Sequence, residues 1–299
     1  MGELSQKAAR HWRWARQDGV STLIEEDDLR PISRASRAWR KWRWRRAHGV
    51  IAGTAMPVWL VGVQRSGTNM VVRGLEESPE VEVHNENDSA AFERFRLRPD
   101  PVVRGVVLAS RHRYVLFKPL CDSHRVDELL TLETPTPGRA IWAYRGVDGR
   151  VRSALAKFGD TNLRVLTEIV AGRGGEMWQA QRLSADNLEL LRSFDWTSMT
   201  PASAAALFWY VRNSLFFDLA LERRDDVLLS SYDALVAAPE AGTTAVASFL
   251  GMQWQPGLAQ HIERRDGGRP VRVELDPRVR KLCDELQERL DAVAAVQAP

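Results

Sequence analysis

The sequence predicts an α/β fold, a three-layer sandwich in which helices cover both faces of a central parallel sheet. From residue 57 onward, short apolar runs suited to buried strands alternate with longer helix-compatible stretches. The apolar run 58–63 leads through a glycine-bounded loop directly into one such stretch. The 299 residues, 44% hydrophobic and 27% charged, are enough for one large domain with a sizeable core.

The elements follow in order along the chain. Strands are expected at 58–63, 114–118, 140–144 and 226–230, with a short strand and turn at 81–88, and helices at 68–77, 123–131, 150–158, 184–192, 202–223, 240–250 and 276–293. Helix 202–223 is apolar on too many sides for a single stripe, so we expect it in the core. The Gly/Arg-rich stretch 159–182 is expected to be a loop or mobile lid.

The segment from Gly62 to Asn69 carries the strongest chemical signal. The spacing of Gly62 and Gly67 matches the start of a Walker A loop, but Thr68 and Asn69 replace the lysine and the Mg²⁺-binding hydroxyl. Such a loop turns backbone N–H groups toward one point, and the helix that follows adds partial positive charge. The segment therefore predicts a P-loop-like site for a phosphate or sulfate without a metal-bridged triphosphate. The alternative is an ordinary strand–turn–helix connection with incidental glycines.

A second segment places an arginine at the end of a strand. Arg145 follows the apolar run 140–144, and Ser153 lies eight residues later in a helix-compatible stretch. Ligands of open α/β sheets bind at the carboxyl ends of strands, and an arginine fork binds phosphate bidentately. The pair predicts a second phosphate site. Without the first motif, a salt-bridged surface arginine and a helix-facing hydroxyl would be the simpler interpretation.

Together the two segments resemble the sulfotransferases that use 3′-phosphoadenosine 5′-phosphosulfate (PAPS), in a bacterial form. In that family a loop of the form (Pro/Gln)-(Arg/Lys)-(Ser/Thr)-Gly-Thr-(Thr/Asn) holds the 5′-phosphosulfate, and a later Arg with a Ser eight residues on holds the 3′-phosphate. Residues 227–240 are similar to the family's Tyr-Glu-(Asp)-Leu-…-Pro segment, and the resemblance covers residues 57–290. It implies that the donor is bound by Gln64, Arg65, Ser66, Gly67, Thr68, Asn69, Arg145 and Ser153.

The sequence departs from the family pattern in two places. Lys118 is followed by Pro119 and Leu120 where the animal cytosolic branch has Thr and a catalytic His. The family's Gly-x-x-Gly-x-Trp-Lys signature near the C-terminus is absent, and the nearest segment is 264–269. Arg269, beside two glycines, is a candidate for a further contact with the 3′-phosphate.

Five residues are candidates for the chemistry of sulfuryl transfer. The resemblance assigns Arg65 to stabilising the leaving group, and Lys118 either contacts the transferring sulfonate or forms an edge salt bridge. Glu86 is the first candidate for the base, since bacterial and Golgi-type members often place a glutamate here. His84 is the second, because an unperturbed histidine titrates nearest neutrality, and His124 is the third. The alternative for Glu86 and His84 is ordinary solvated loop residues.

The resemblance implies transfer of a sulfuryl group from PAPS to a hydroxyl of a carbohydrate, glycolipid or small metabolite, without a metal. We expect the acceptor site at 86–100 and at 159–182, and the arginines of the first segment suggest a polar or acidic acceptor. That segment contributes Phe92, Arg94, Phe95, Arg96 and Arg98. Two other classes stay open: a P-loop kinase-like phosphotransferase, which would need a divalent metal, and a non-catalytic binding protein with this fold.

The domain prediction is a basic Trp/Arg-rich extension at 1–56 and a sulfotransferase domain at 57–299. As a helix, residues 34–47 place Trp39 and Trp42 on one face, ringed by arginines, with no acidic residue. Three interpretations stay open: packing of the Trp face on the catalytic domain, contact with an anionic membrane surface, and binding of nucleic acid.

Charge and cysteine content point to a compartment. The net charge of +3 with a pI near 9.1 suits anionic ligands without demanding nucleic acid, which we do not expect as a partner. Two distant cysteines, Cys121 and Cys283, argue for a reducing compartment and against a disulfide framework or zinc site. The sequence shows no secretory signal and no apolar run long enough to span a membrane. We expect a cytoplasmic protein, peripheral at the inner membrane face if residues 34–47 bind lipid; the sequence leaves the oligomeric state open.

Overall fold

The computed structural model describes residues 31–265 and 271–297, with only the backbone of residues 31–34. The chain divides into two units, residues 1–49 and 50–299. The described part of the first unit is the helix α3, Pro31–His48, which ends in a basic turn containing Arg45 and Arg46. The second unit holds the sheet and every site residue predicted above.

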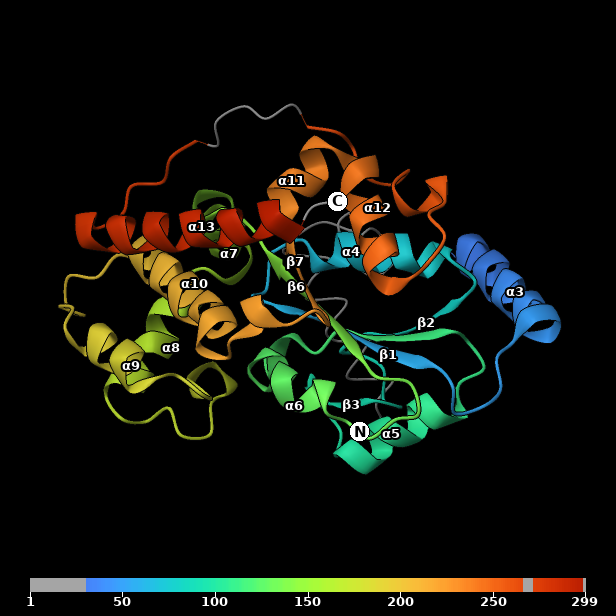
Figure 1. The fold of residues 1–299 in the computed structure, drawn as a ribbon. Coiled ribbons are helices and arrows are strands. Elements are labelled where there is room, and N and C mark those ends of the chain that lie inside the picture. The colour runs from blue at the N-terminus through green and yellow to red at the C-terminus, as the bar shows by residue number, and fades with distance from the viewer. Residues whose placement is uncertain (1–30, 266–270, 298–299) are drawn as a thin grey trace. The chain divides into compact units, whose positions relative to one another are not determined.

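The core of the second unit is a sheet of five parallel strands in the order β2-β5-β1-β6-β7 (Figure 1). The strands are β1 (Met56–Gly62), β2 (Val81–His84), β5 (Tyr114–Phe117), β6 (Arg139–Tyr144) and β7 (Val227–Ser231). β1 is central and nearly continuous in apolar side chains, as a strand covered on both faces must be.

Helices complete the other two layers. They are α4 (Thr68–Glu77), α5 (Asp100–Ala109), α6 (Val126–Leu130), α7 (Val147–Phe158), α8 (Thr161–Val170), α9 (Ala185–Arg192), α10 (Pro201–Asp218), α11 (Tyr232–Ala237), α12 (Pro239–Leu250) and α13 (Pro277–Gln297). Four short 3₁₀ turns, η1 (Leu120–Arg125), η2 (Trp178–Ala180), η3 (Leu221–Arg223) and η4 (Pro256–Leu258), and a small hairpin of β3 (Phe92–Glu93) and β4 (Arg96–Leu97) complete the second unit.

Alternate residues of β1 enter two different cores, which confirms the predicted three-layer α/β fold. Trp59 and Val61 pack with α5, α6, α7, α8, α10 and α13. Val58 and Leu60 pack with α4, α11 and α12 on the opposite face. Figure 1 shows α4 and α12 on one side of the strands and α5 and α6 on the other.

Several elements differ from the sequence prediction, which did not include α5, α11 or the β3–β4 hairpin. The stretch 159–182 contains the helix α8, because Val165, Leu166 and Ile169 form an apolar stripe buried in the larger core. The helix predicted at 123–131 begins as the 3₁₀ turn η1 instead. The long helix predicted at 202–223 ends at Asp218, where Ala220 adopts φ 51° and breaks it before η3.

Candidate functional site

The loop between β1 and α4 is held from two sides. Gly62 has φ 129° and a Cβ there would collide with the carbonyl oxygen of Ala143 on β6. Gly67 has φ 85°, and a Cβ there would collide with the ring of Tyr232 at the start of α11. The hydroxyl of Ser123 also hydrogen bonds to the amide and carbonyl of Gly62, at 3.0 and 3.1 Å. The glycines are therefore required by close packing as well as by backbone conformation.

The loop presents polar groups that no neighbour satisfies. Gly67 is the N-cap of α4, no side chain caps this end, and the first turn contains no acidic residue. Ser66 is 1% exposed, and its hydroxyl has no hydrogen-bond partner among the described residues. Open amides at a helix N-terminus beside a buried hydroxyl suit a phosphate or sulfate group. The residues present therefore fit the anion that the sequence predicts.

The two predicted anion motifs meet through a direct hydrogen bond. Arg65 donates from Nε to the Ser153 hydroxyl on α7, at 2.9 Å. Arg65 itself has φ 72°, an uncommon conformation for a residue with a side chain. The sequence predicted Ser153 as a partner of Arg145 in a separate phosphate site. The structure brings Ser153 to the loop of the first motif, and its predicted pairing with Arg145 at a phosphate stays a prediction.

Arg145 lies at the end of β6, as predicted. Its guanidinium carbon stands 4.2 Å from the centre of the Tyr232 ring, the same ring that packs against Gly67. Its Nε is buried without a hydrogen-bond partner among the described residues. Burial lowers the pKa of Arg145, and Asp233 partly opposes this. Arg145 thus has a buried Nε without a hydrogen-bond partner among the described residues, and it packs against the same tyrosine ring as the loop.

Arg150 is a site residue that the sequence reasoning missed. It is fully buried on α7, and its guanidinium donates to the carbonyl of Gln64 at 3.4 Å and to that of Ala205 at 2.8 Å. Burial, and then Arg65, lower its pKa to about 9, and Nη2 has no partner among the described residues. The available signal was an arginine on the same helix face as Val147 and Val151.

Three residues from three different segments form a chain beside the loop. Lys118, just after β5, donates from Nζ to the Oδ1 of Asn69 at 2.7 Å. The same Nζ lies 3.9 Å from Oε2 of Glu86, which follows β2. Burial raises the pKa of Glu86, while Lys118 and the amides of Cys121 and Leu120 oppose the rise. A largely buried carboxylate with a raised pKa therefore lies next to the anion loop.

His84 is occupied by carboxylates. Its Nδ1 lies 2.7 Å from Oδ2 of Asp88, its Nε2 lies 3.5 Å from Oε1 of Glu82, and its ring stacks on Phe117. Burial lowers the pKa of His84, but the hydrogen bond to Asp88 and the nearby carboxylate of Glu82 outweigh it and raise the pKa to about 9. The imidazole is thus protonated at neutral pH and has no lone pair to accept a proton. This environment suits a structural cation better than the base that the sequence offered as its second candidate.

His124, the third candidate for the base, is buried on η1. Burial and the nearby arginines, first among them Arg212, lower its pKa to about 3, so the ring is neutral. Its Nδ1 has no hydrogen-bond partner among the described residues. The remaining predicted donor contact, Arg269, lies outside the described residues.

The hairpin of β3 and β4 lies in the segment predicted to contact the acceptor. Its two turn residues, Arg94 and Phe95, have φ 49° and 67°, which is costly for residues other than glycine and asparagine. Arg96 pairs with the buried Asp122 on η1 at 2.5 Å. Phe95 is 41% exposed at the tip. A strained tip anchored by an ion pair to a buried aspartate suits a binding element.

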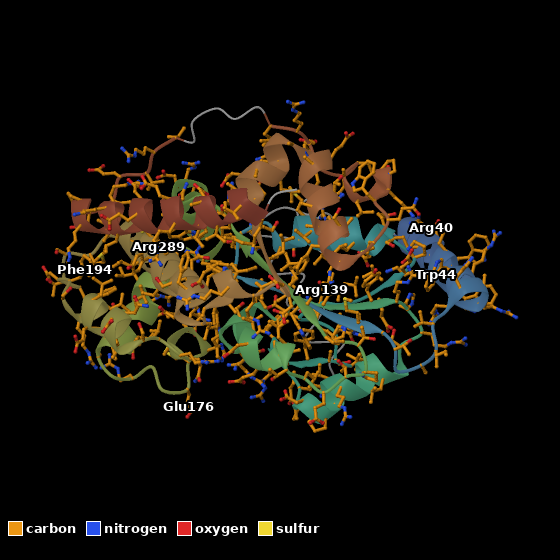
Figure 2. The ribbon with its side chains drawn as sticks, in the orientation of Figure 1. Arg40, Trp44, Arg139, Glu176, Phe194 and Arg289 are labelled. Atoms are coloured by element: carbon orange, nitrogen blue, oxygen red, sulfur yellow. The ribbon has the colours of Figure 1, made fainter. Side chains whose placement is uncertain are left out.

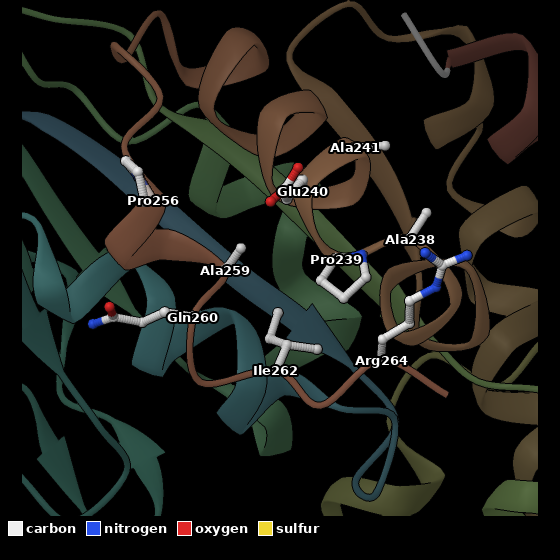
Figure 3. Close-up of a pocket in the computed structure, with 9 residues that line it drawn as sticks. All are labelled: Ala238, Pro239, Glu240, Ala241, Pro256, Ala259, Gln260, Ile262 and Arg264. Atoms are coloured by element: carbon white, nitrogen blue, oxygen red, sulfur yellow. The ribbon is translucent and has the colours of Figure 1, made fainter. Parts of the chain in front are cut away.

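A separate pocket of 590 Å³ lies beside α12 and η4 (Figure 3). It is lined by Ala238, Pro239, Glu240, Ala241, Pro256, Ala259, Gln260, Ile262 and Arg264. None of the predicted site residues lines it. Within the described ranges, no three His, Cys, Asp or Glu side chains gather as metal ligands, and no described helix is both long and apolar enough to cross a membrane.

Comparison with known proteins found likeness in structure only. No family model and no curated protein matches the sequence. A sulfotransferase domain from the curacin biosynthetic pathway is 12% identical with a TM-score of 0.47, over 78% of this chain and 98% of that one.

Two further solved structures are similar. The sulfotransferase domain of the Synechococcus PCC 7002 olefin synthase is 15% identical, with a TM-score of 0.41, over 82% of this chain and 96% of that one. A sulfotransferase from Alicyclobacillus acidocaldarius is 14% identical, with a TM-score of 0.39, over 81% of this chain and 96% of that one. The fold class stated above rests on the strand order and the two cores of the chain itself. The chain is similar in structure to bacterial sulfotransferase domains.

Proposed function

We propose that the chain is a PAPS-dependent sulfotransferase that transfers a sulfuryl group to a hydroxyl of a carbohydrate, glycolipid or small metabolite. The observation that carries the proposal is the row Glu86–Lys118–Asn69. It joins a buried carboxylate to an anion-binding loop through a cation, at 3.9 and 2.7 Å. Base, cation and anion cradle are the three parts that transfer of a sulfuryl group to a hydroxyl requires.

Each part has a role in the reaction. The acceptor oxygen forms a bond to sulfur as the bond from sulfur to the bridging oxygen of the donor breaks, so negative charge grows on that bridging oxygen. Arg65 and the amides at the start of α4 stabilise this charge, because Arg65 belongs to the loop and no side chain caps that helix end. Glu86 takes the proton of the acceptor hydroxyl, and Lys118 holds the transferring group.

The donor would be held at both ends by residues around the loop. Ser66 and Thr68, both buried, and the amides of the loop suit the 5′-phosphosulfate. Arg145 and Ser153 suit the 3′-phosphate. Arg150 lies behind Gln64 and adds positive charge without reaching the surface. Three buried polar atoms without partners, on Ser66, Arg145 and Arg150, support an anionic guest at this place.

The test is binding of the desulfated donor, adenosine 3′,5′-bisphosphate. At about 100 times its Kd it should stabilise the protein by about 2.7 kcal/mol, a rise in Tm of roughly 5 °C, equally with Mg²⁺ or EDTA. Arg145→Ala should lose most of this rise. Arg164→Ala, a change at an exposed arginine on α8, is the matched control and should keep it.

Other outcomes would separate the alternatives. Stabilisation by ATP only when Mg²⁺ is present would favour a P-loop kinase-like phosphotransferase. Binding of adenosine 3′,5′-bisphosphate without transfer of labelled sulfate from PAPS to any hydroxyl acceptor would favour a non-catalytic binding protein.

We also propose that α3 contacts an anionic membrane surface, which would place the protein at the inner face of the membrane. Trp39 and Trp42 are the two most exposed described aromatic side chains of this helix, at 56% and 47%. Arg43 and Arg46 lie over these two rings, at 5.6 and 4.9 Å. Figure 2 shows Arg40 and Trp44 on the same helix. Exposed tryptophans among arginines suit the headgroup region of a bilayer.

A further inference from the structure

Arg212 on α10 is a buried cation without a counterion. It is 3% exposed, and the described residues offer it no carboxylate within ion-pair distance. Nη1 donates to the carbonyls of Gln181 at 3.1 Å and Gln179 at 3.5 Å, and Nη2 has no partner among the described residues. Burial lowers its pKa only to about 10, so the charge persists at neutral pH. An uncompensated buried charge is strongly destabilising unless an anion accompanies it.

A second unsatisfied group faces the same region from η1. His124 is 3% exposed, and its Nδ1 also lacks a partner in the described part of the chain. Arg182 donates to the carbonyl of His124 at 3.1 Å, and Arg212 donates to the carbonyl of the adjacent Gln181, so His124 and Arg212 both lie against the same short segment. A neutral imidazole that carries its proton on Nδ1 donates a hydrogen bond. With the His124 proton on Nδ1, the pair offers two donors, one of them charged, to the same guest.

The other arginines of this region are neutralised. Arg96 pairs with Asp122 at 2.5 Å, and Arg182 pairs with Asp127 at 2.7 Å. Their side chains are 36% and 38% exposed. Of the three arginines Arg96, Arg182 and Arg212, only the buried Arg212 is not paired with a carboxylate.

This region adjoins the base. The amide of Cys121, three residues before His124 on η1, bonds to Glu86. Because Cys121 and His124 lie on the same turn η1, the element that carries His124 is also the element that contacts Glu86.

We propose that Arg212 and His124 form an anion subsite that binds an acidic group of the acceptor, the oxygens of a carboxylate, sulfate or phosphate. That the bound group belongs to the acceptor depends on the function proposed above, whereas the subsite depends only on the two unpaired side chains. Such a subsite narrows the substrate class to hydroxyl compounds that already carry a negative charge. A neutral acceptor would leave both donors buried and unsatisfied, which disfavours its binding.

The experiment measures thermal stability of the full chain with adenosine 3′,5′-bisphosphate at saturation, so that the donor sites are filled. Sodium sulfate, sodium glucuronate and glucose are added in turn at constant ionic strength. We expect sulfate and glucuronate to raise Tm by a further 2 °C or more, on the order of 1 kcal/mol, and glucose to have no effect.

Arg212→Met should abolish the response to both anions. Because it removes an unpaired buried charge, it should leave the anion-free protein as stable as the wild type. Arg224→Met is the matched control: Arg224 is paired with Asp226 at 2.7 Å, so this variant should lose stability and keep the anion response. Should Arg212→Met fail to fold, Arg212→Lys serves instead, and its response should be reduced in the same direction.

The outcomes distinguish the two proposals. An anion response unchanged in the Arg212 variants, or a response to sulfate without glucuronate, overturns the acceptor subsite and leaves the sulfotransferase proposal intact. Absence of any effect of adenosine 3′,5′-bisphosphate, together with an Arg212-dependent anion response, overturns the sulfotransferase proposal and leaves the anion subsite standing. Arg212→Met that is destabilised as much as Arg224→Met assigns Arg212 to fixing residues 178–181 alone.

Discussion

Glu86 is the residue whose surroundings most resemble those of a catalytic base. Its carboxylate is 17% exposed and lies beside a lysine that itself touches the anion loop. Glu86→Gln should lower kcat by about 10²–10⁴-fold, because it removes proton transfer while preserving shape. Binding of adenosine 3′,5′-bisphosphate, measured by calorimetry, should not change. A kcat within threefold of the wild type would remove Glu86 from the chemistry.

The same residue sets the expected pH dependence. Burial raises the pKa of Glu86 above its ordinary 4.5, so kcat should rise with pH through that raised value and then level off. For stability the sign is opposite: the folded chain holds the Glu86 proton more tightly, so this contribution is lost as pH rises from 4.5 through the folded pKa. A kcat profile whose midpoint lies near 9 would instead assign the base to His84.

Gly67 is the residue on which the shape of the loop depends. Gly67→Ala introduces a Cβ into the Tyr232 ring at a backbone conformation that alanine rarely adopts. We expect a loss of stability of about 1–3 kcal/mol and loss of nucleotide binding. Gly105→Ala on α5 is the control and should be neutral or slightly stabilising, because an added Cβ there would have no atom of another element within 4 Å. Thermal shift with and without nucleotide measures both; unchanged nucleotide binding in Gly67→Ala would contradict the assignment.

At the scale of elements, α3 is expected to act as a lipid-binding helix. The full chain should sediment with vesicles containing phosphatidylglycerol and stay in solution with neutral phosphatidylcholine vesicles. A Trp39→Ala/Trp42→Ala double variant should reduce binding by about tenfold, because two interfacial anchors are lost. Equal vesicle binding of the variant would count against the tryptophans as membrane anchors. A preference of the full chain for an oligonucleotide of equal charge would favour nucleic acid as the partner.

The elements that could be predicted are those with a local cause. The helix α4 occupies the predicted range 68–77, since the glycine before it and the apolar stripe within it are both visible in sequence. The 3₁₀ turn η1 could not be predicted, because its place depends on Ser123 bonding to Gly62, sixty-one residues away. α8 was missed because the glycines after it dominated the reading of 159–182.

For the whole molecule, alternation of strands and helices was enough to predict the layers but gave no information about which strands are neighbours. The strand order β2-β5-β1-β6-β7 brings the ends of β2, β5 and β6 around the loop that follows β1. That order explains why Glu86, Lys118 and Asn69 form one row. Arg150 and Arg212 could not be identified from the sequence for a different reason: an arginine without a counterion looks ordinary until its burial is known.

The domain boundary predicted at residue 57 stays a prediction, and the structure divides the chain between Gly49 and Val50. The two cysteines that suggested a reducing compartment are both buried and unpaired. The described part of the chain thus forms its cores without a disulfide.

The hydrogen bond between Arg65 and Ser153 would couple the two phosphate-binding ends of the proposed donor site. The Ser153 oxygen accepts the hydrogen bond from Arg65, and its hydroxyl proton can still donate to another group. One oxygen atom can thereby touch the cation assigned to the sulfuryl end while offering its proton to the opposite end. Binding of a phosphate at one end would therefore change the affinity at the other end through this single oxygen atom, without a hinge or domain movement.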